Sequence, residues 1–158
     1  MAYDVTTTPA ISGATKQNEY IRLRDAIQAV SAAGAHDFGG DWLSGVINVA
    51  FVDLPGSCEL EIDGTNLTGL SVYLEVNAFA GVGNAAAGSP QFRLFNVTLG
   101  GAVASSTITV TSVSPGARKR GASGAITLNT ALNTYKVQIL SDSGIRSFGG
   151  RARLTIRG

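Results

Sequence analysis

The sequence contains few of the side chains on which catalysis and metal binding depend. It has one histidine, His36, and one cysteine, Cys58. A single cysteine cannot form an intrachain disulfide framework, and one histidine with one cysteine cannot complete a zinc tetrad. A histidine-based triad or dyad would have to use His36, and no sequence pattern nominates a nucleophile for it. We therefore predict that the protein is not an enzyme and binds no cofactor or metal.

Long apolar runs are missing as well. No run approaches the roughly 20 residues of a membrane-spanning helix, and the N-terminus lacks a basic segment followed by an apolar core. Charged residues make up 15% of the chain, while glycine is abundant, with 20 residues. We expect no membrane contact, and a domain of strands joined by turns.

Acidic and basic residues are separated along the chain. Residues 1–80 carry three basic and ten acidic side chains (net −7), and residues 81–158 carry nine basic side chains and one acidic (net +8). The basic residues are dispersed and do not form a run of the kind found in nucleic-acid-binding tails. We expect the two halves to attract each other, within one subunit or between neighbours, and we expect no nucleic-acid partner.

Residues 1–17 are predicted to form an extended arm. Their sequence is MAYDVTTTPAISGATKQ, which shows no sustained periodicity. An arm of this kind is disordered alone and becomes ordered against a partner. Tyr3, Val5 and Ile11 are therefore candidates for docking to another protein. The alternative is a terminus without a role.

Residues 18–34 are predicted to form a short helix. Its main apolar residues follow the spacing i, i+3, i+7 and i+10, which places them on one stripe: Tyr20, Leu23, Ile27 and Val30. The stripe is narrow, like a coiled-coil seam, and it spans only about two heptads. It packs either on the protein's own β domain or at the axis of an oligomer.

Residues 35–44 are predicted to be a turn-rich junction, and residues 45–158 a single β domain. From residue 45 onward the apolar residues recur with a period of two, as on half-buried strands. Strands are expected at 46–52, 58–62, 70–76, 92–97, 107–113, 126–128, 135–140 and 151–157. Residues 80–90 and 114–125 are expected loops, and Gly100-Gly101 a hairpin turn. About eight strands with short turns favour a β-sandwich or jelly roll.

Two charged clusters in the β domain are candidate sites. Glu59 and Glu61 would point the same way on one strand, about 6.6 Å apart, a separation also found in inverting glycosidases. Acids that alternate with an apolar stripe are more often a solvated face, and we interpret them so. Arg118, Lys119 and Arg120 form the densest basic cluster. Since no aromatic residues interleave them, docking to an acidic protein surface explains them as well as phosphate binding does.

The order of these parts resembles that of a known class of proteins. A Thr- and Pro-containing arm, one short helix with the sequence NEYIRLRDAIQAV, and a Gly- and Thr-rich β domain resemble small virion proteins of tailed bacteriophages. These are capsid decoration (cement) proteins and short head or tail fibres, which are often trimeric. The resemblance implies a homotrimer in the virion, assembled in the host cytoplasm, that binds capsid or tail components through its arm.

A carbohydrate- or receptor-binding β-sandwich is the alternative function. Sugar-binding surfaces usually present aromatic side chains that stack on the sugar ring. Aromatic residues make up 7% of this chain, and Trp42 is the single tryptophan. The sequence therefore favours the virion structural protein over the carbohydrate-binding module.

The helix stripe generates a first prediction, that the protein self-associates, as a trimer. Replacing Leu23 and Ile27 by glutamine removes two apolar side chains from the stripe, so assembly should weaken if the stripe lies between subunits. Sedimentation of wild-type and double-variant protein measures this. A wild-type protein that is monomeric at micromolar concentrations contradicts self-association, and a double variant that still assembles assigns the stripe to the subunit core.

Overall fold

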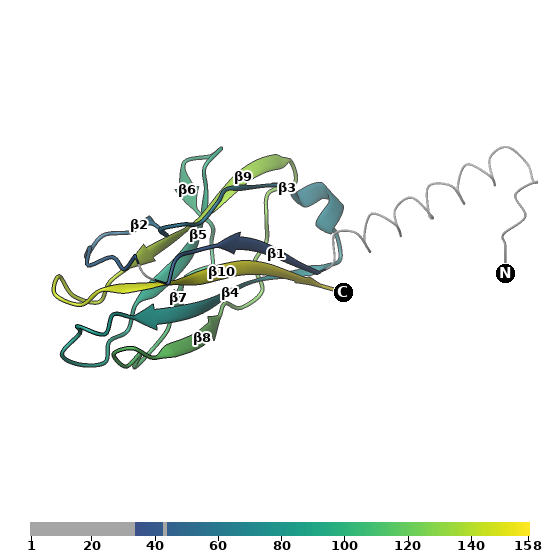
Figure 1. The fold of residues 1–158 in the computed structure, drawn as a ribbon. Coiled ribbons are helices and arrows are strands. Elements are labelled where there is room, and N and C mark those ends of the chain that lie inside the picture. Colours follow the sequence, from purple (N-terminus) through teal and green to yellow (C-terminus); the bar gives the residue numbers. More distant parts are fainter. Residues whose placement is uncertain (1–33, 43) are drawn as a thin grey trace, which may run out of the picture.

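The structure, a computed structural model, describes residues 34–42 and 44–158 (Figure 1). The predicted arm and the predicted helix up to residue 33 lie outside these residues, and both stay predictions. The same holds for the arm and stripe residues named above, which are Tyr3, Val5, Ile11, Tyr20, Leu23, Ile27 and Val30.

The first of two antiparallel sheets has four strands. Their spatial order is β1 (Gly34–Gly39), β10 (Phe148–Arg157), β4 (Ser71–Ala80) and β8 (Arg118–Ala122). Gly34 pairs with Ile156, while Ala80 pairs with Phe148 at the opposite end of β10. The described chain therefore begins and ends at the same pole of the domain (Figure 1).

The second sheet is built around two longer strands, β9 (Leu132–Leu140) and β5 (Gln91–Asn96). Shorter strands extend it on both sides: β2 (Val52–Asp53) and β3 (Leu60–Asp63) pair with β9, and β6 (Gly101–Ala102) and β7 (Ile108–Thr109) pair with β5. The described residues contain one helical element, the 3-10 turn η1 (Gly64–Leu67). None of their helices is long and apolar enough to span a membrane.

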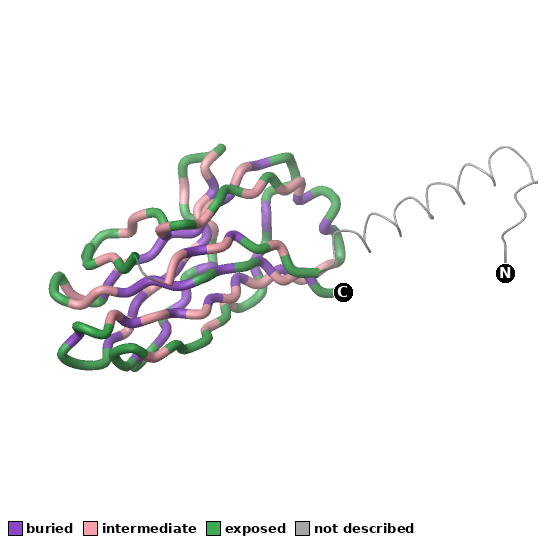
Figure 2. The backbone as a smooth tube through the Cα atoms, in the orientation of Figure 1, coloured by how far each residue is buried: buried purple, intermediate pink, exposed green. Residues whose placement is uncertain are grey.

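The strands β4 and β10 are the two central strands of the first sheet, and their sequences alternate over most of their length. Each buries every second residue along most of its ten residues (Figure 2). Leu74 lies opposite Leu154, and Glu75 lies opposite Arg153. Side chains of opposed residues point to the same face, so this register directs the apolar residues of both strands inward and the charged ones outward.

One hydrophobic core lies between the two sheets. Leu74 and Phe148 contribute to it from the first sheet, and Phe92, Leu94 and Val137 from the second; all five are fully buried. Full burial of a large apolar side chain contributes about 1.5–3 kcal/mol. The structure thus confirms a mainly β protein, with two antiparallel sheets around a shared core.

The junction predicted for residues 35–44 is wrong in its first half. Gly34–Gly39 form β1, which pairs with β10, so the β domain begins before residue 45. Phe38 is the fully buried side chain of this short strand. The glycines at both ends of the strand give the segment the composition of a turn, and one buried residue is too little to reveal a period of two.

The buried strand predicted for residues 46–52 is also wrong. Only its last residue belongs to β2, and Ile47 and Val49 are 52% and 68% exposed. The backbone of this segment makes isolated contacts: Val46 bridges to Phe148, and the Ser141 amide donates to the Asn48 carbonyl at 2.9 Å. An apolar run does not identify a strand when the run has no continuous partner to pair with.

The loop predicted for residues 114–125 contains β8, which pairs with β4. The strand escaped recognition because it has no apolar face. Its outward positions carry Arg118 and Arg120, and an inward position is Gly121. A Cβ on Gly121 would come within 2.8 Å of Val110 and 2.9 Å of Ile108, so these two side chains fill the core where β8 has none.

The other strand predictions are confirmed with shifted boundaries. The segments 58–62, 70–76, 92–97, 107–113, 135–140 and 151–157 overlap β3, β4, β5, β7, β9 and β10, respectively. The predicted turn at Gly100-Gly101 joins β5 to β6, with Gly100 at φ 67°. The segment 126–128 makes only a bridge, between Ile126 and Val72.

The core generates a second prediction. Leu94→Ala removes a fully buried side chain and leaves a cavity, which should lower the free energy of unfolding by about 2–5 kcal/mol. Leu99→Ala makes the same chemical change at a position that is 62% exposed, and it should cost less than about 1 kcal/mol. Denaturant unfolding of both variants measures the difference. Equal losses would show that the core is not centred between the sheets.

Candidate functional site

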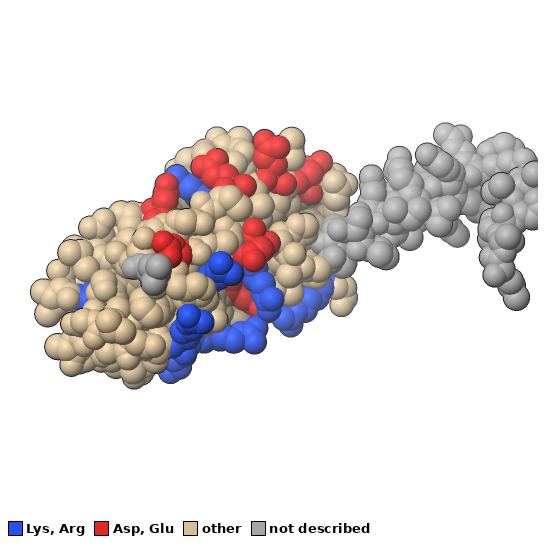
Figure 3. Space-filling model, in the orientation of Figure 1, with Lys and Arg blue, Asp and Glu red and all other residues tan. Residues whose placement is uncertain are grey.

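The outer face of the first sheet carries a cluster of arginines, which we call the arginine face. Its members are Arg118, Arg120, Arg151, Arg153 and Arg157, on β8 and β10. Figure 3 shows basic side chains along this part of the surface, and acidic side chains gathered over the region of β2 and β3. The charge separation along the sequence thus becomes a separation in space.

Glu75 is the acidic centre of the arginine face. Arg153 donates two hydrogen bonds to its Oε2, from Nε at 3.0 Å and from Nη2 at 2.7 Å. Arg157 donates to its Oε1 at 2.8 Å, and Arg120 lies 3.4 Å from Oε2. The Glu75 side chain is only 11% exposed. The predicted attraction between the two halves of the chain therefore occurs within one subunit here.

This environment changes the acidity of Glu75. The hydrogen bonds from Arg153 are the main cause that lowers the pKa of Glu75 below its ordinary value of 4.5. Burial acts in the opposite direction, and the charges of Arg153 and Arg157 add to the lowering. Glu75 is therefore a carboxylate that stays ionised and occupied by its arginine partners.

The next row of the sheet differs from the Glu75 row in charge. Asn77 lies opposite Arg151 on one side and opposite Arg120 on the other. Its amide is neutral, so it does not compensate these two cations. The side chain of Arg151 is also the one arginine side chain on this face that, among the described residues, makes no hydrogen bond, ion pair or ring contact. Positive charge is therefore left over in the Asn77 row.

Trp42 stands beside this row because Gly149 of β10 and Gly40 let the two chain segments pass close together. A Cβ on Gly149 would come within 3.1 Å of the Asp41 carbonyl oxygen, and a Cβ on Gly40 within 3.0 Å of the Arg151 Cα. The Asp41 amide also donates to the Pro55 carbonyl at 2.8 Å. The segment that carries Trp42 is thereby held against the sheet, and its indole ring has Arg118 Cζ 4.2 Å from the ring centre.

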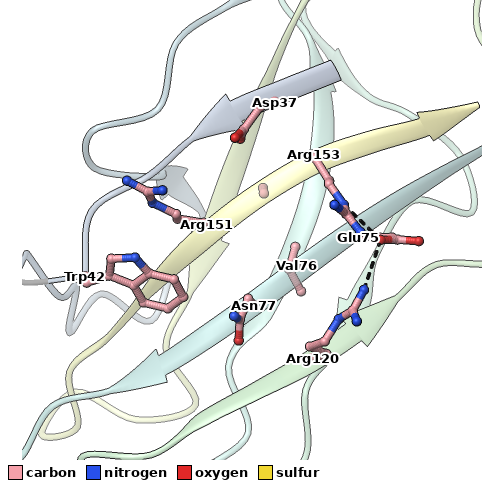
Figure 4. Close-up of a pocket in the computed structure, with 9 residues that line it drawn as sticks. Asp37, Trp42, Glu75, Val76, Asn77, Arg120, Arg151 and Arg153 are labelled. Carbon is pink, nitrogen blue, oxygen red and sulfur yellow. Dashed lines mark hydrogen bonds and ion pairs between the residues drawn. The ribbon is translucent and has the colours of Figure 1, made fainter. Parts of the chain in front are cut away.

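A hollow of about 330 Å³ lies between these side chains. Figure 4 shows its lining residues, which come from β1, β4, β8, β10 and the segment after β1. They are Asp37, Trp42, Glu75, Val76, Asn77, Arg120, Arg151, Ala152 and Arg153. Arginines, an amide and an aromatic ring can hold a polar anionic ligand.

The predicted basic cluster is divided by the structure. Arg118 and Arg120 belong to the arginine face, whereas Lys119 is directed elsewhere and its Nζ donates to the Thr111 carbonyl at 2.8 Å. The sequence showed no aromatic residue near this cluster, but the fold brings Trp42 against Arg118. Residues that are adjacent in sequence therefore do not indicate which side chains will lie close together across a sheet.

Other candidate residues lie away from the hollow. Glu59 and Glu61 are exposed, before and within β3, which fits a solvated face. Cys58 is also exposed, with its sulfur 3.8 Å from the Asp37 carbonyl oxygen. Within residues 34–42 and 44–158, no group of three or more histidine, cysteine, aspartate or glutamate side chains is placed to hold a metal ion.

The outer face of the second sheet carries polar side chains that hydrogen-bond to one another. Arg93 donates to the Gln138 side-chain oxygen at 2.9 and 2.7 Å and lies over the ring of Phe51, 3.9 Å from its centre. Asp53 accepts from Gln138 at 3.1 Å and from Lys136 at 2.8 Å. Burial alone would raise the pKa of Asp53, but these hydrogen bonds outweigh it and lower the pKa.

Sequence reasoning missed most of the hollow. Asn77, Arg151 and Arg153 were visible only as the polar positions of two alternating segments, which usually form a solvated face. The missing information was the pairing of β4 with both β10 and β8. The signal that could have drawn attention was Arg151, Arg153 and Arg157 on one face of a single strand.

Comparison with known proteins identifies no family for this chain. Neither a protein-family profile nor a curated protein sequence matches it. Among solved structures, it is similar to a chain in the structure of infectious bursal disease virus Gx strain, with a TM-score of 0.49 and 15% sequence identity. The similarity covers 78% of this chain and 31% of that chain. At this level the similarity carries no conclusion about function.

Glu75 generates a third prediction. Its folded pKa lies below the ordinary value of 4.5, so its pairing adds stability above that pH, and this stability is lost as the pH falls through the folded pKa. Glu75→Gln should lower the free energy of unfolding at neutral pH by about 1–3 kcal/mol. The gap to the wild type should close in acid.

Chemical denaturation over a pH series measures this gap. Glu61→Gln makes the same substitution at an exposed position and should leave the free energy of unfolding nearly unchanged at every pH. A gap for Glu75→Gln that stays constant from neutral to acid pH would contradict the role assigned to its charge.

Proposed function

We propose that this chain is a non-enzymatic structural protein of a bacteriophage virion, which decorates or cements the capsid or forms a short fibre as a homotrimer. Its partners in this role are its own copies and other virion proteins, such as capsid or tail components. The proposal includes no cofactor, no nucleic acid and no membrane. The proposal is based on two observations, the order of the parts in the sequence and the architecture of the β domain.

The order of the strands is the observation that carries the proposal. We assign the fold as a jelly roll by counting β2 with β3, and β6 with β7, as single strand positions. About eight positions then fill two sheets, in the order β1-β10-β4-β8 and β2/β3-β9-β5-β6/β7. The chain crosses to the other sheet at each step except one, because β5 is followed by β6/β7 in the same sheet. Jelly rolls are common in viral capsid domains and in lectins.

The placement of the chain ends supports an attached, outward-facing domain. Gly34 lies at the pole where β10 ends, so the 33 residues that precede it join the domain at that pole. The loop from 81 to 90 and the loop between β9 and β10 lie at the other pole (Figure 1). An arm that binds a particle would thus leave these loops free.

A non-enzymatic role is supported by the chemistry of the hollow. Its carboxylate Glu75 is occupied by arginines, and the pKa of Glu75 is lowered. A general acid needs a raised pKa near the working pH, so this group is unsuited to that task. Arginine, asparagine and tryptophan side chains commonly bind ligands through hydrogen bonds, ion pairs and stacking, without forming covalent intermediates.

A second candidate function is the carbohydrate- or receptor-binding module considered from the sequence. One observation favours it, namely that Trp42, Asn77 and Arg151 meet at the hollow on the arginine face. Lectins are the other frequent use of the jelly roll. The two functions are compatible, because a virion protein that faces outward can also bind a ligand.

The proposed virion role generates a fourth prediction. Protein lacking residues 1–17 should keep its fold and its own oligomeric state, because the core lies in the β domain, but it should lose incorporation into particles. Ordering an arm costs roughly 1–2 kcal/mol per residue, so its contact with the particle must be extensive. Co-sedimentation of full-length and truncated protein with particles that lack this protein measures incorporation.

The control is full-length protein with Arg118, Lys119 and Arg120 replaced by glutamine, which should still co-sediment. Equal incorporation of the truncated and full-length forms would contradict anchoring by the arm. Incorporation lost only in the control would assign anchoring to the basic cluster Arg118, Lys119 and Arg120.

A further inference from the structure

The Glu75 row shows how this sheet holds a carboxylate. Arginines from β10 and β8 approach Glu75 from both sides, and Arg153 binds it through two hydrogen bonds. Charge-assisted bonds of this kind are about twice as strong as neutral ones. One row away, Asn77 has an arginine directly opposite it on both neighbouring strands, Arg151 on β10 and Arg120 on β8, whereas Glu75 has Arg153 on β10 and Ala122 on β8.

A ligand carboxylate above Asn77 would therefore lie between two arginines, as the Glu75 carboxylate does. Arg151 is uncommitted among the described residues, and the Arg120 side chain is 73% exposed with only a long contact of 3.4 Å to Glu75. Both can turn toward a ligand without breaking a strong internal bond. The Asn77 amide can donate a further hydrogen bond to the ligand.

The rest of the lining selects among carboxylate ligands. Trp42 supplies an aromatic ring, and Asp37 supplies a carboxylate whose oxygens only accept hydrogen bonds. A simple anion uses neither group and is repelled by Asp37. A sugar ring can stack on the indole and donate hydroxyl groups to Asp37. The volume of about 330 Å³ falls in the range of small-ligand pockets.

A nucleic-acid backbone fits this face less well. Phosphate binding gains affinity from each cation it contacts, but here Glu75 occupies Arg153 and Arg157, and Asp37 adds a further negative charge. On the outer face of the opposite sheet, Arg93, Gln138, Asp53 and Lys136 already hydrogen-bond to one another.

We propose that the hollow on the arginine face binds an acidic saccharide. Its carboxylate lies between Arg151 and Arg120 above Asn77, and its ring lies against Trp42. The inference deepens the second candidate function, carbohydrate binding, and does not depend on the virion role. Particle incorporation through the arm tests that role separately, so failure of one leaves the other standing.

The test is titration of the full-length protein, observed by NMR through the Trp42 indole and the arginine side-chain signals. The probes are the methyl glycosides of N-acetylneuraminic acid and of glucuronic acid. Methyl glucoside is the neutral match, and acetate and inorganic phosphate are the simple anions. A Glu-rich peptide tests for a protein ligand. At least one acidic glycoside should bind more tightly than methyl glucoside, acetate and phosphate.

Two variants locate the site and one controls for charge. Asn77→Asp places a carboxylate of the same size between the arginines and should occupy them, and Arg151→Gln removes the uncommitted cation. Each substitution should lower the affinity for the acidic glycoside by about tenfold or more, which is the effect of losing one charge-assisted hydrogen bond. Lys119→Gln removes one charge from the same strand region outside the hollow and should leave affinity unchanged. Thermal unfolding checks that each variant is folded.

Several results would overturn the proposal. They are equal binding of methyl glucoside, binding of acetate or phosphate as tight as that of the glycosides, tighter binding of the Glu-rich peptide, and no binding of either acidic glycoside at millimolar concentration. If Lys119→Gln lost as much affinity as Arg151→Gln, the loss would follow from the change in net charge alone. That result would also overturn the assigned site.

Discussion

The register between β4 and β10 is the constraint on which both the core and the arginine face depend. Because side chains alternate along a strand, a slip of β4 by one residue would turn Leu74 to solvent and direct Glu75 into the core, away from Arg153. Burying charges away from their partners is expensive. The same backbone ladder that closes the core therefore also sets the arginines in rows, at spacings that repeat along the sheet.

The sequence predicted the parts of this fold that repeat. The alternating segments 70–76 and 151–157 could be recognised, since each places an apolar residue at every second position. It could not reveal β1 or β8, where glycine stands at strand ends or at an inward position. The hollow was hidden for a related reason: Trp42, Asn77 and Arg151 are remote in sequence, and only strand pairing unites them.

The two outer faces show how similar compositions give different capacities. On the second sheet, Arg93, Gln138 and Asp53 form a closed chain of hydrogen bonds, with each polar group used by a neighbour. On the first sheet, one acid serves three arginines, and a neutral amide occupies the next row. A surface whose polar groups already hydrogen-bond to one another gains little from binding a partner. An uncompensated positive charge beside an aromatic ring can still form a new ion pair with a ligand.

The chain enters and leaves the β domain at one pole, where Gly34 pairs with Ile156. An affinity tag or fluorescent reporter joined after Gly158 would therefore emerge at the pole where Gly34 begins β1. Val82, by contrast, is 82% exposed in the loop between β4 and β5 at the far pole, and a Cβ on the adjacent Gly83 would meet no atom within 4 Å. Loop tips of this kind accept inserted sequence. A peptide epitope placed between Val82 and Gly83 would be displayed at the end of the domain away from the arm.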